Sequence, residues 1–346
     1  MSRAAAAAPA GDRYAVRRRW ALAGLVVLLA AVAALSLTLG AVTVRPGEVL
    51  DVLADHLGLP GDDPTFQADA VVWNIRLPRL LLGLTVGAAL AVAGAALQGV
   101  FRNPMADPHL LGIGPGAALG AVIGSLAGAT RGAIGAGVAA GVLTALLVRR
   151  LGRAPAMEPS RFILAGVALG AALTAWVGFV VFSADSLEVP PIEFWLLGSL
   201  VGSTWRILGT TAAIVALTLA GLLAAARTLD VLSLGEAEAR HLGVDVDLAT
   251  TVIVMTVGAV TGATVGAVGV VVFVGLLVPH LVRRLSGPAH RHLMILSALG
   301  GAVFVAASDL AARTIAEPAD IPVGLVTAVV GGPFFIWLIQ RRREAT

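Results

Sequence analysis

The sequence contains no cysteine and no lysine, and only 13% of its 346 residues are charged. The lack of cysteine excludes disulfides, thiolate metal sites and cysteine nucleophiles. The lack of lysine excludes a nucleotide-binding loop of the G-x-x-x-x-G-K-[ST] type, because the lysine of that loop must reach the phosphates. Neither H-E-x-x-H nor G-x-S-x-G occurs, and we expect no catalytic residue, metal site or cofactor. The chain is therefore not expected to be an enzyme.

Apolar residues are abundant instead: 58% of the chain is hydrophobic, and the mean hydropathy is +0.92. Soluble globular proteins have about 25% charged residues. Lipid must therefore surround most of this chain, which we expect to be an all-α membrane protein with one membrane domain. The isoelectric point is about 10.7, but the net charge is only +3 and the arginines lie in small groups between apolar runs. This pattern favours charges that orient the chain in a bilayer over a nucleic-acid partner.

Ten apolar runs are predicted to cross the membrane as helices. The first has 22 residues, whereas the apolar part of a signal peptide normally has about 7 to 15. We therefore expect a retained first helix, a disordered cytoplasmic tail at residues 1–19, and a single membrane domain over residues 20–343. The spans are predicted at residues 20–41, 79–99, 110–128, 132–150, 161–183, 206–226, 250–267, 269–284, 292–313 and 321–340.

The positions of the arginines test this topology independently, because cytoplasmic segments carry an excess of positive residues. With ten spans and a cytoplasmic N-terminus, 18 of the 24 arginines fall on the cytoplasmic side. An even number of spans places the C-terminus in the cytoplasm as well. The arginines expected outside are Arg45, Arg76, Arg79, Arg131, Arg206 and Arg313.

The two halves of the chain share a weak repeat at an offset of 171 residues, with nine identities in 26 aligned positions. Its clearest part is the recurrence of residues 85–88 as residues 256–259. The second and seventh spans would run in opposite directions, which predicts the inverted repeats found in many transporters. The apolar run 250–284 is too long for one span, and Gly266 and Gly269 are the predicted break.

Two predicted cytoplasmic connections have unusual compositions. Residues 228–247 mix apolar and charged side chains, with Gly235 and Gly243 as breaks. This pattern predicts a pair of short amphipathic helices that dock into a cytoplasmic partner, with an ordinary solvated loop as the alternative. Residues 98–116 contain three prolines and four glycines. We expect non-helical backbone there, packed on protein or lining a water-filled cavity, or simply a tight connection.

A few polar residues lie at predicted helix ends. His109 and His280 each follow a proline, and we interpret both as interfacial hydrogen-bonding residues rather than metal ligands or proton relays. Asp309 is the carboxylate expected inside a span, four residues before Arg313, which predicts an ion pair on one helix face. Residues 190–198 are predicted to form a short helix at the outer surface.

Five segments of the chain form a recognisable set. In order, they are Arg76-Leu77-Pro78-Arg79, residues 98–108, residues 234–244, residues 273–280 and residues 322–335. In these segments the chain resembles the FecCD-type permeases, which belong to ATP-binding-cassette importers of iron-siderophores, haem or vitamin B12. The resemblance covers roughly residues 20–343. One departure is Gly114-Pro115-Gly116-Ala117, where many members have Ser-Ser or Ser-Asn before the next Gly-Ala.

The resemblance implies a ten-helix permease in the plasma (inner) membrane of a bacterium. It would form a dimer with a second permease copy or a homologue, around a central path. Two ATPase subunits would bind its cytoplasmic face, consistent with the missing lysine, and a substrate-binding protein would bind its outer face. The residues that would meet the ATPase are Gly235, Glu236, Ala239, Leu242 and Gly243.

Three outer arginines match family positions that pair with glutamates of the binding protein, namely Arg76, Arg79 and Arg313. Arginine suits such contacts because its planar fork orients a carboxylate partner. The alternative is that Arg76 and Arg79 only anchor a helix end at the lipid headgroups.

An iron-siderophore complex is the expected substrate, because it is the commonest substrate class of the family, with haem or cobalamin as alternatives. An ion-coupled secondary transporter is a further alternative, which predicts several buried acidic or histidine residues at mid-membrane. A membrane-embedded enzyme would need a nucleophile and base or a metal site.

Overall fold

The structure is a computed structural model that describes residues 10–127, 130–152, 159–184, 195–317 and 319–343. The described residues form helices and connections and contain no strand. The helices are α1 (Ala10–Thr38), α2 (Pro46–His56), α3 (Phe66–Val71), the π-helix η1 (Val72–Arg76), α4 (Leu77–Val100), α5 (Ile113–Leu126), α6 (Thr130–Gly152), α7 (Pro159–Phe182), α9 (Trp205–Ala224), α10 (Ala226–Leu232), α11 (Glu236–His241), α12 (Val246–Val268), α13 (Val274–Ser286), α14 (His290–Thr314) and α15 (Val323–Arg343).

The ten predicted spans overlap α1, α4, α5, α6, α7, α9, α12, α13, α14 and α15. Within the described residues, seven helical stretches are long and apolar enough to cross a membrane, and these include α1, α4, α6, α7, α9, α12 and α14. The helix α5 and the apolar part of α15 are shorter, and α13 has 13 residues. The all-helical prediction is therefore confirmed for the described chain, whereas the number of spans stays a prediction.

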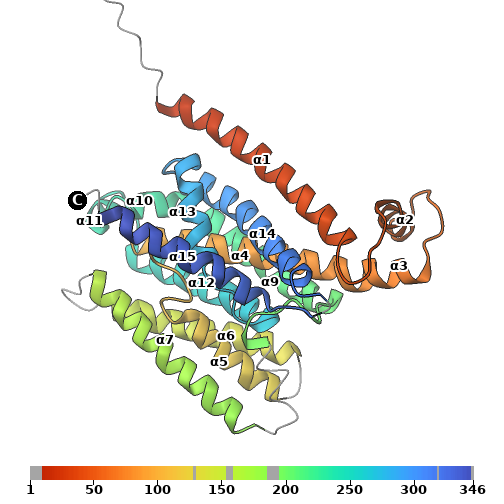
Figure 1. Cartoon of the computed structure of the whole chain (residues 1–346). Helices are drawn as coiled ribbons and strands as arrows, with labels where there is room; N and C mark the ends of the chain where they lie inside the picture. Colours follow the sequence, from red (N-terminus) through yellow and green to blue (C-terminus); the bar gives the residue numbers. More distant parts are fainter. Residues whose placement is uncertain (1–9, 128–129, 153–158, 185–194, 318, 344–346) are drawn as a thin grey trace, which may run out of the picture.

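The molecule is a bundle with α4 and α12 at its centre. The most apolar stretches of these helices are 78% and 67% buried, against 17% for α1 and for α7. Figure 1 shows α4, α12, α14 and α15 between α1 on one side and α7 on the other. The outer helices expose large apolar residues such as Leu164, Phe179 and Phe182, as expected for surfaces that face lipid.

Glycines allow the central helices to approach closely. A Cβ atom added at Gly87 of α4 would lie 2.1 Å from the carbonyl oxygen of Gly301 in α14. A Cβ atom added at Gly258 of α12 would lie 2.6 Å from the carbonyl oxygen of Gly141 in α6. Close backbone approach of this kind holds helices together in lipid. Gly87 and Gly258 are equivalent in the sequence repeat, so both copies use the same position to pack a neighbouring helix.

The helices α4 and α12 run antiparallel, as inverted repeats require. The end of α4 and the start of α12 line the same cavity. At their opposite ends, Leu200 packs against Gly83 near the start of α4, and Ser199 N donates to the carbonyl of Val268 at the end of α12.

Three predictions about helix boundaries have different outcomes. Gly269 ends α12 with a positive φ of 74°, so the break there is confirmed, whereas Gly266 lies inside α12 and packs against Ile134. The helix α1 begins at Ala10, so it includes the second half of the tail expected at residues 1–19. Alanine and arginine favour helix, and Arg18 Nε donates to the carbonyl of Ser286 at 2.7 Å. The short helix predicted at 190–198 falls mostly outside the described residues.

Two ends of the bundle carry most of the polar contacts. We call them the α11 end, which contains α10, α11 and the starts of α12 and α14, and the α2 end, which contains α2, α3 and the start of α4. They lie at the left and the right of Figure 1.

Candidate functional site

The α11 end contains the predicted pair of short helices. Gly235 and Gly243 have positive φ values of 126° and 82°, which glycine adopts without strain, and they bound α11 on both sides. The preceding helix α10 ends at Leu232. The predicted helix pair and its two glycine breaks are therefore confirmed.

The predicted contact residues of this pair face in different directions. Leu242 is 62% exposed, and the side chain of Glu236 is 60% exposed and forms an ion pair with Arg240 at 3.4 Å. Ala239 is fully buried, so its role is to seat α11 on the bundle. Leu234 is 64% exposed and belongs to the same outward surface, although the sequence interpretation did not select it. In the sequence, its position directly before Gly235 was the signal that could have identified it.

The helix α10 is attached to α14. The carboxylate of Asp230 accepts from His290 N at 2.8 Å and lies 2.7 Å from Nδ1 of the same histidine. It therefore satisfies a free N–H group at the start of α14. The His290 ring in turn leaves no room for a side chain at Gly99, where a Cβ atom would lie 2.6 Å from Nε2. The contacts of α10 thus reach both α14 and the end of α4.

The helix α11 lies beside the connection between α4 and α5. Arg102 in this connection has a positive φ of 47°, and its Nη1 atom lies 3.8 Å from where a Cβ of Gly235 would be. A polar cavity of about 430 Å³ separates α11 from the ends of α4 and α6 and the start of α12. At its wall, Arg149 donates to the carbonyl of Asp247 at 2.8 Å. Residues of α11 and of three long helices therefore line the same cavity.

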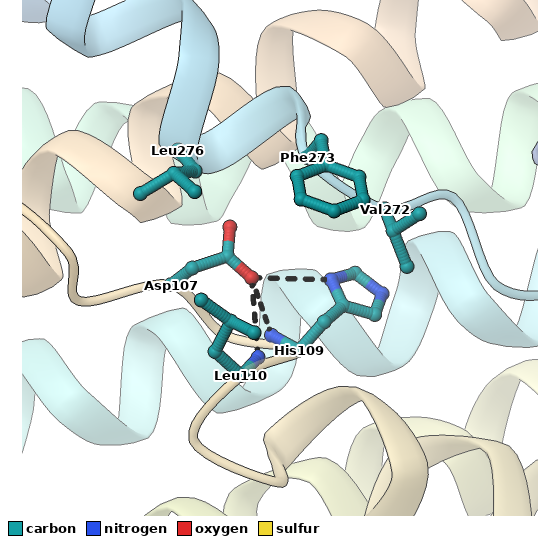
Figure 2. Close-up of a pocket in the computed structure, with 6 residues that line it drawn as sticks. All are labelled: Asp107, His109, Leu110, Val272, Phe273 and Leu276. Atoms are coloured by element: carbon teal, nitrogen blue, oxygen red, sulfur yellow. Dashed lines mark hydrogen bonds and ion pairs between the residues drawn. The ribbon is translucent and has the colours of Figure 1, made fainter. Parts of the chain in front are cut away.

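The connection between α4 and α5 is non-helical backbone packed on protein, which is one of the predicted alternatives. The carboxylate of Asp107 accepts from His109 N at 2.8 Å and from Leu110 N at 3.3 Å, and so fixes the turn. Figure 2 shows this carboxylate pointing toward the start of α13, where a cavity of about 80 Å³ is closed by Phe273 and Leu276. The side chain of Asp107 is 3% exposed.

His109 is not an interfacial residue as the sequence predicts. Its side chain is 8% exposed, with Nδ1 3.8 Å from the Asp107 carboxylate, and its Nε2 atom is buried with no hydrogen-bond partner. The ring fills the space beside Gly114, where a Cβ atom would lie 2.3 Å from Cδ2. The glycine that departs from the family pattern therefore accommodates a histidine.

Phe273 connects this site to α15. Its φ is 67°, an uncommon value for a residue with a bulky side chain. A Cβ atom added at Gly331 of α15 would lie 2.3 Å from Cγ of this ring. His280, predicted at a helix boundary, instead lies inside α13, with its ring centroid 6.1 Å from that of Phe334 in α15. The start of α13 therefore touches both the α4–α5 connection and α15.

The α2 end contains the three arginines that match the family's docking positions. Arg76 donates to the carbonyls of Leu37, at 2.7 Å, and Val42, and Arg313 donates to that of Ser36 at 2.5 Å. The last turn of α1 has no basic residue of its own. Arginines from η1 and α14 therefore donate to free carbonyls at this helix end, and their charges compensate the negative end of the helix dipole.

Arg79 binds two carboxylates. Its Nη2 atom lies 2.9 Å from Oδ1 of Asp309, and its Nη1 atom lies 3.2 Å from Oδ2 of Asp320. The predicted ion pair between Asp309 and Arg313 is confirmed at 3.9 Å, but Arg79 is the closer partner. The sequence interpretation missed Asp320, which follows α14 in an irregular turn where no periodicity indicates its partner. Arg76, Arg79 and Arg313 are 5%, 9% and 9% exposed, so all three turn into the chain.

Within the described ranges, no three histidine or carboxylate side chains gather as metal ligands would. Apolar helices surround a buried centre that is packed through glycines, and a pair of short helices lies at one end. This arrangement is that of a membrane permease. The model of the FecCD transport family matches residues 28–341. The chain belongs to this family and is an ABC importer permease.

Its relatives carry different substrate names. The hemin transport system permease protein HmuU of Yersinia pestis is 39% identical, over 79% of this chain and 84% of the relative. The cobalamin import system permease protein BtuC of Halobacterium salinarum is 39% identical, over 80% of this chain and 74% of the relative. The Fe(3+) dicitrate transport system permease protein FecD of Escherichia coli is 37% identical, over 79% of this chain and 86% of the relative.

A solved structure agrees with the fold over nearly the whole chain. It is described as a metal-chelate type ABC transporter in an inward-facing conformation. The two structures align with a TM-score of 0.79 and 32% identity, over 92% of this chain and 98% of that one.

Proposed function

We propose that the chain forms the translocation path of an importer for iron-siderophore complexes in the plasma membrane of a bacterium, with ten spans and both termini in the cytoplasm. Family membership carries this proposal. Among the relatives described above, HmuU and FecD are named for iron compounds, and the solved structure is named for a metal chelate. Cobalamin, named for BtuC, is the second candidate.

Substrate choice can be tested by transport. The chain, reconstituted in liposomes with its ATPase and each candidate binding protein, is supplied with a labelled ferric siderophore, haem or cobalamin. ATP-dependent uptake of the ferric siderophore is expected. Uptake of only haem or cobalamin would refute the siderophore but keep the importer, whereas uptake driven by an ion gradient without ATP would refute the importer.

The α11 end is proposed to receive the ATPase. Leu234 and Leu242 are exposed apolar residues on the two sides of α11, and an exposed apolar pair suits a groove on a partner. Movement of α11 would reach α15 through the α4–α5 connection and Phe273. The absence of lysine is consistent with hydrolysis in a separate chain, and Asp309, neutralised by Arg79, does not resemble an ion-coupling carboxylate.

A single substitution tests this contact. Leu242→Glu should abolish co-elution with the ATPase, because it places a charge in an apolar groove. Leu57→Glu is the control, since Leu57 is 67% exposed and lies at the α2 end. Equal co-elution of both variants would contradict the proposal.

The α2 end is proposed to receive the substrate-binding protein, with Arg76, Arg79 and Arg313 as the cations that attract its glutamates. These arginines are engaged inside the chain, so a partner carboxylate would have to compete with Asp320, whose side chain is 36% exposed. Asp320→Asn should therefore strengthen docking, because it removes the competing charge. Unchanged docking would show that Arg79 has a structural role only.

A charge-reversal pair completes the docking test. Arg313→Glu should weaken binding of the substrate-binding protein. Arg206→Glu makes the same charge change at an exposed outer arginine and is expected to have little effect. Co-elution with the ATPase reports whether each variant is folded.

A further inference from the structure

The groove between residues 15–22 of α1 and the first two turns of α14 has no role in the proposed transport cycle. It has a volume of about 360 Å³ and lies on the side of the bundle where α1 packs along α14. Residues of α1 line one wall and residues of α14 the other, including Ala15, Arg18, Arg19, Leu22, His292 and Ile295. Its walls are mostly apolar, and its polar atoms come from basic side chains.

Positive charge is concentrated at this groove. The helices α1 and α14 are parallel, because Arg18 contacts Ser286 just before α14 begins and Arg313 contacts Ser36 near the end of α1. The N-terminal dipole end of α14, equivalent to about half a positive charge, lies at the groove beside Arg18 and Arg19 of α1. Arg18 and Arg291 also act electrostatically on His292.

The nearby acidic group does not neutralise this charge. Asp230 is the carboxylate that acts on His292, and it is already engaged by the backbone and ring of His290. Arg18 is held in place by its Nε bond to Ser286 and lies 6.0 Å from the centre of the Tyr14 ring. The groove therefore presents positioned cations.

The apolar part of the groove continues into the membrane. The apolar run of α1 begins at Trp20, directly after the arginines, and Trp20 is 75% exposed, as is typical of a residue at the membrane interface. Leu22 and Ile295 follow on the lipid side and are 43% and 40% exposed. A ligand in this groove would meet arginines at one end and an open apolar surface at the other.

We propose that this groove binds an anionic phospholipid, with its phosphate at Arg18, Arg19 and His292 and an acyl chain along Leu22 and Ile295. Basic pockets between membrane helices recognise anionic headgroups, and two arginines offer the charge-assisted bonds that a phosphate accepts. A zwitterionic lipid lacks the net charge that this site complements. The bound lipid would fix the start of α1 against α14.

Native mass spectrometry of the full-length chain in detergent can measure retention of dioleoyl phosphatidylglycerol and dioleoyl phosphatidylcholine. The wild-type chain should retain phosphatidylglycerol preferentially. Arg19→Gln removes one charge-assisted contact and should weaken that retention about ten-fold. Arg17→Gln is the matched control, because Arg17 is exposed on the same helix, carries the same charge and does not line the groove. It should change retention little.

A second variant separates shape from charge. Ala15→Trp fills the groove without changing any charge and should also reduce retention of phosphatidylglycerol. Equal retention of the two lipids by the wild-type chain would overturn the proposal. Equal losses in Arg17→Gln and Arg19→Gln, with none in Ala15→Trp, would overturn it as well, because only diffuse surface charge acts in that case. Thermal unfolding in the same detergent shows that each variant is folded.

Discussion

Single glycines set the distances between the central helices, and Gly94 is the most demanding of them. A Cβ atom there would lie 2.0 Å from the carbonyl oxygen of Gly275 and 2.4 Å from its Cα atom, and both are backbone atoms that cannot rotate away. Gly94→Ala should therefore push α4 and α13 apart and destabilise the chain by about 1–3 kcal/mol, the usual range for overpacking. A lowered thermal midpoint in detergent is the expected result.

The matched control is Gly209→Ala in α9, because no atom lies within 4 Å of the Cβ position there. Alanine favours helix over glycine by up to about 1 kcal/mol, so this variant should be as stable as the wild-type chain or slightly more so. Equal loss of stability in both variants would contradict the close packing of α4 and α13. Sequence alone could not separate these two glycines, because both lie in similar glycine-rich apolar helices and only the neighbouring helix distinguishes them.

At the scale of elements, Asp230 joins α10 to α14. Asp230→Ala removes the cap of α14, which is worth about 1 kcal/mol, and the contact with the His290 ring. In the proposed importer, α10 should then move without α14, so ATP should still be hydrolysed while less substrate is transported per ATP. Asp55→Ala on the exposed side of α2 is the control and should leave this ratio unchanged. A parallel loss of hydrolysis and transport would instead indicate a failure of assembly.

The elements were more predictable than their contacts. Apolar runs identified the long helices, and the glycines at 235 and 243 identified α11, because both signals are local. The helix α1 begins at Ala10, before the apolar run, because the arginines that flank this run are part of the helix. The inward turn of Arg76, and the pairing of Arg79 with Asp320, depend on segments more than 30 residues apart. No local pattern encodes those contacts.

At the scale of the whole molecule, two short helices bear on the predicted number of spans. The helix α5 has 14 residues and α13 has 13, which correspond to about 20 Å each at 1.5 Å per residue. Both are preceded by non-helical connections that are packed inside the bundle, at Asp107 and at Phe273. Backbone of this kind is tolerated at membrane depth when protein surrounds it. Each short helix together with its connection can therefore cover the distance of one span.

Ten spans and seven spans make opposite predictions for the C-terminus. With ten, a fluorescent protein fused after Gln340 should be fluorescent in the cytoplasm, and alkaline phosphatase inserted after Asp62, between α2 and α3, should be active outside. With seven, the two termini would lie on opposite sides. The arginines favour ten, because 18 of 24 then lie inside and the basic C-terminal residues are among them. Active alkaline phosphatase fused after Gln340 would overturn the prediction of ten spans with a cytoplasmic N-terminus, on which the proposed coupling of α11 to a cytoplasmic ATPase depends.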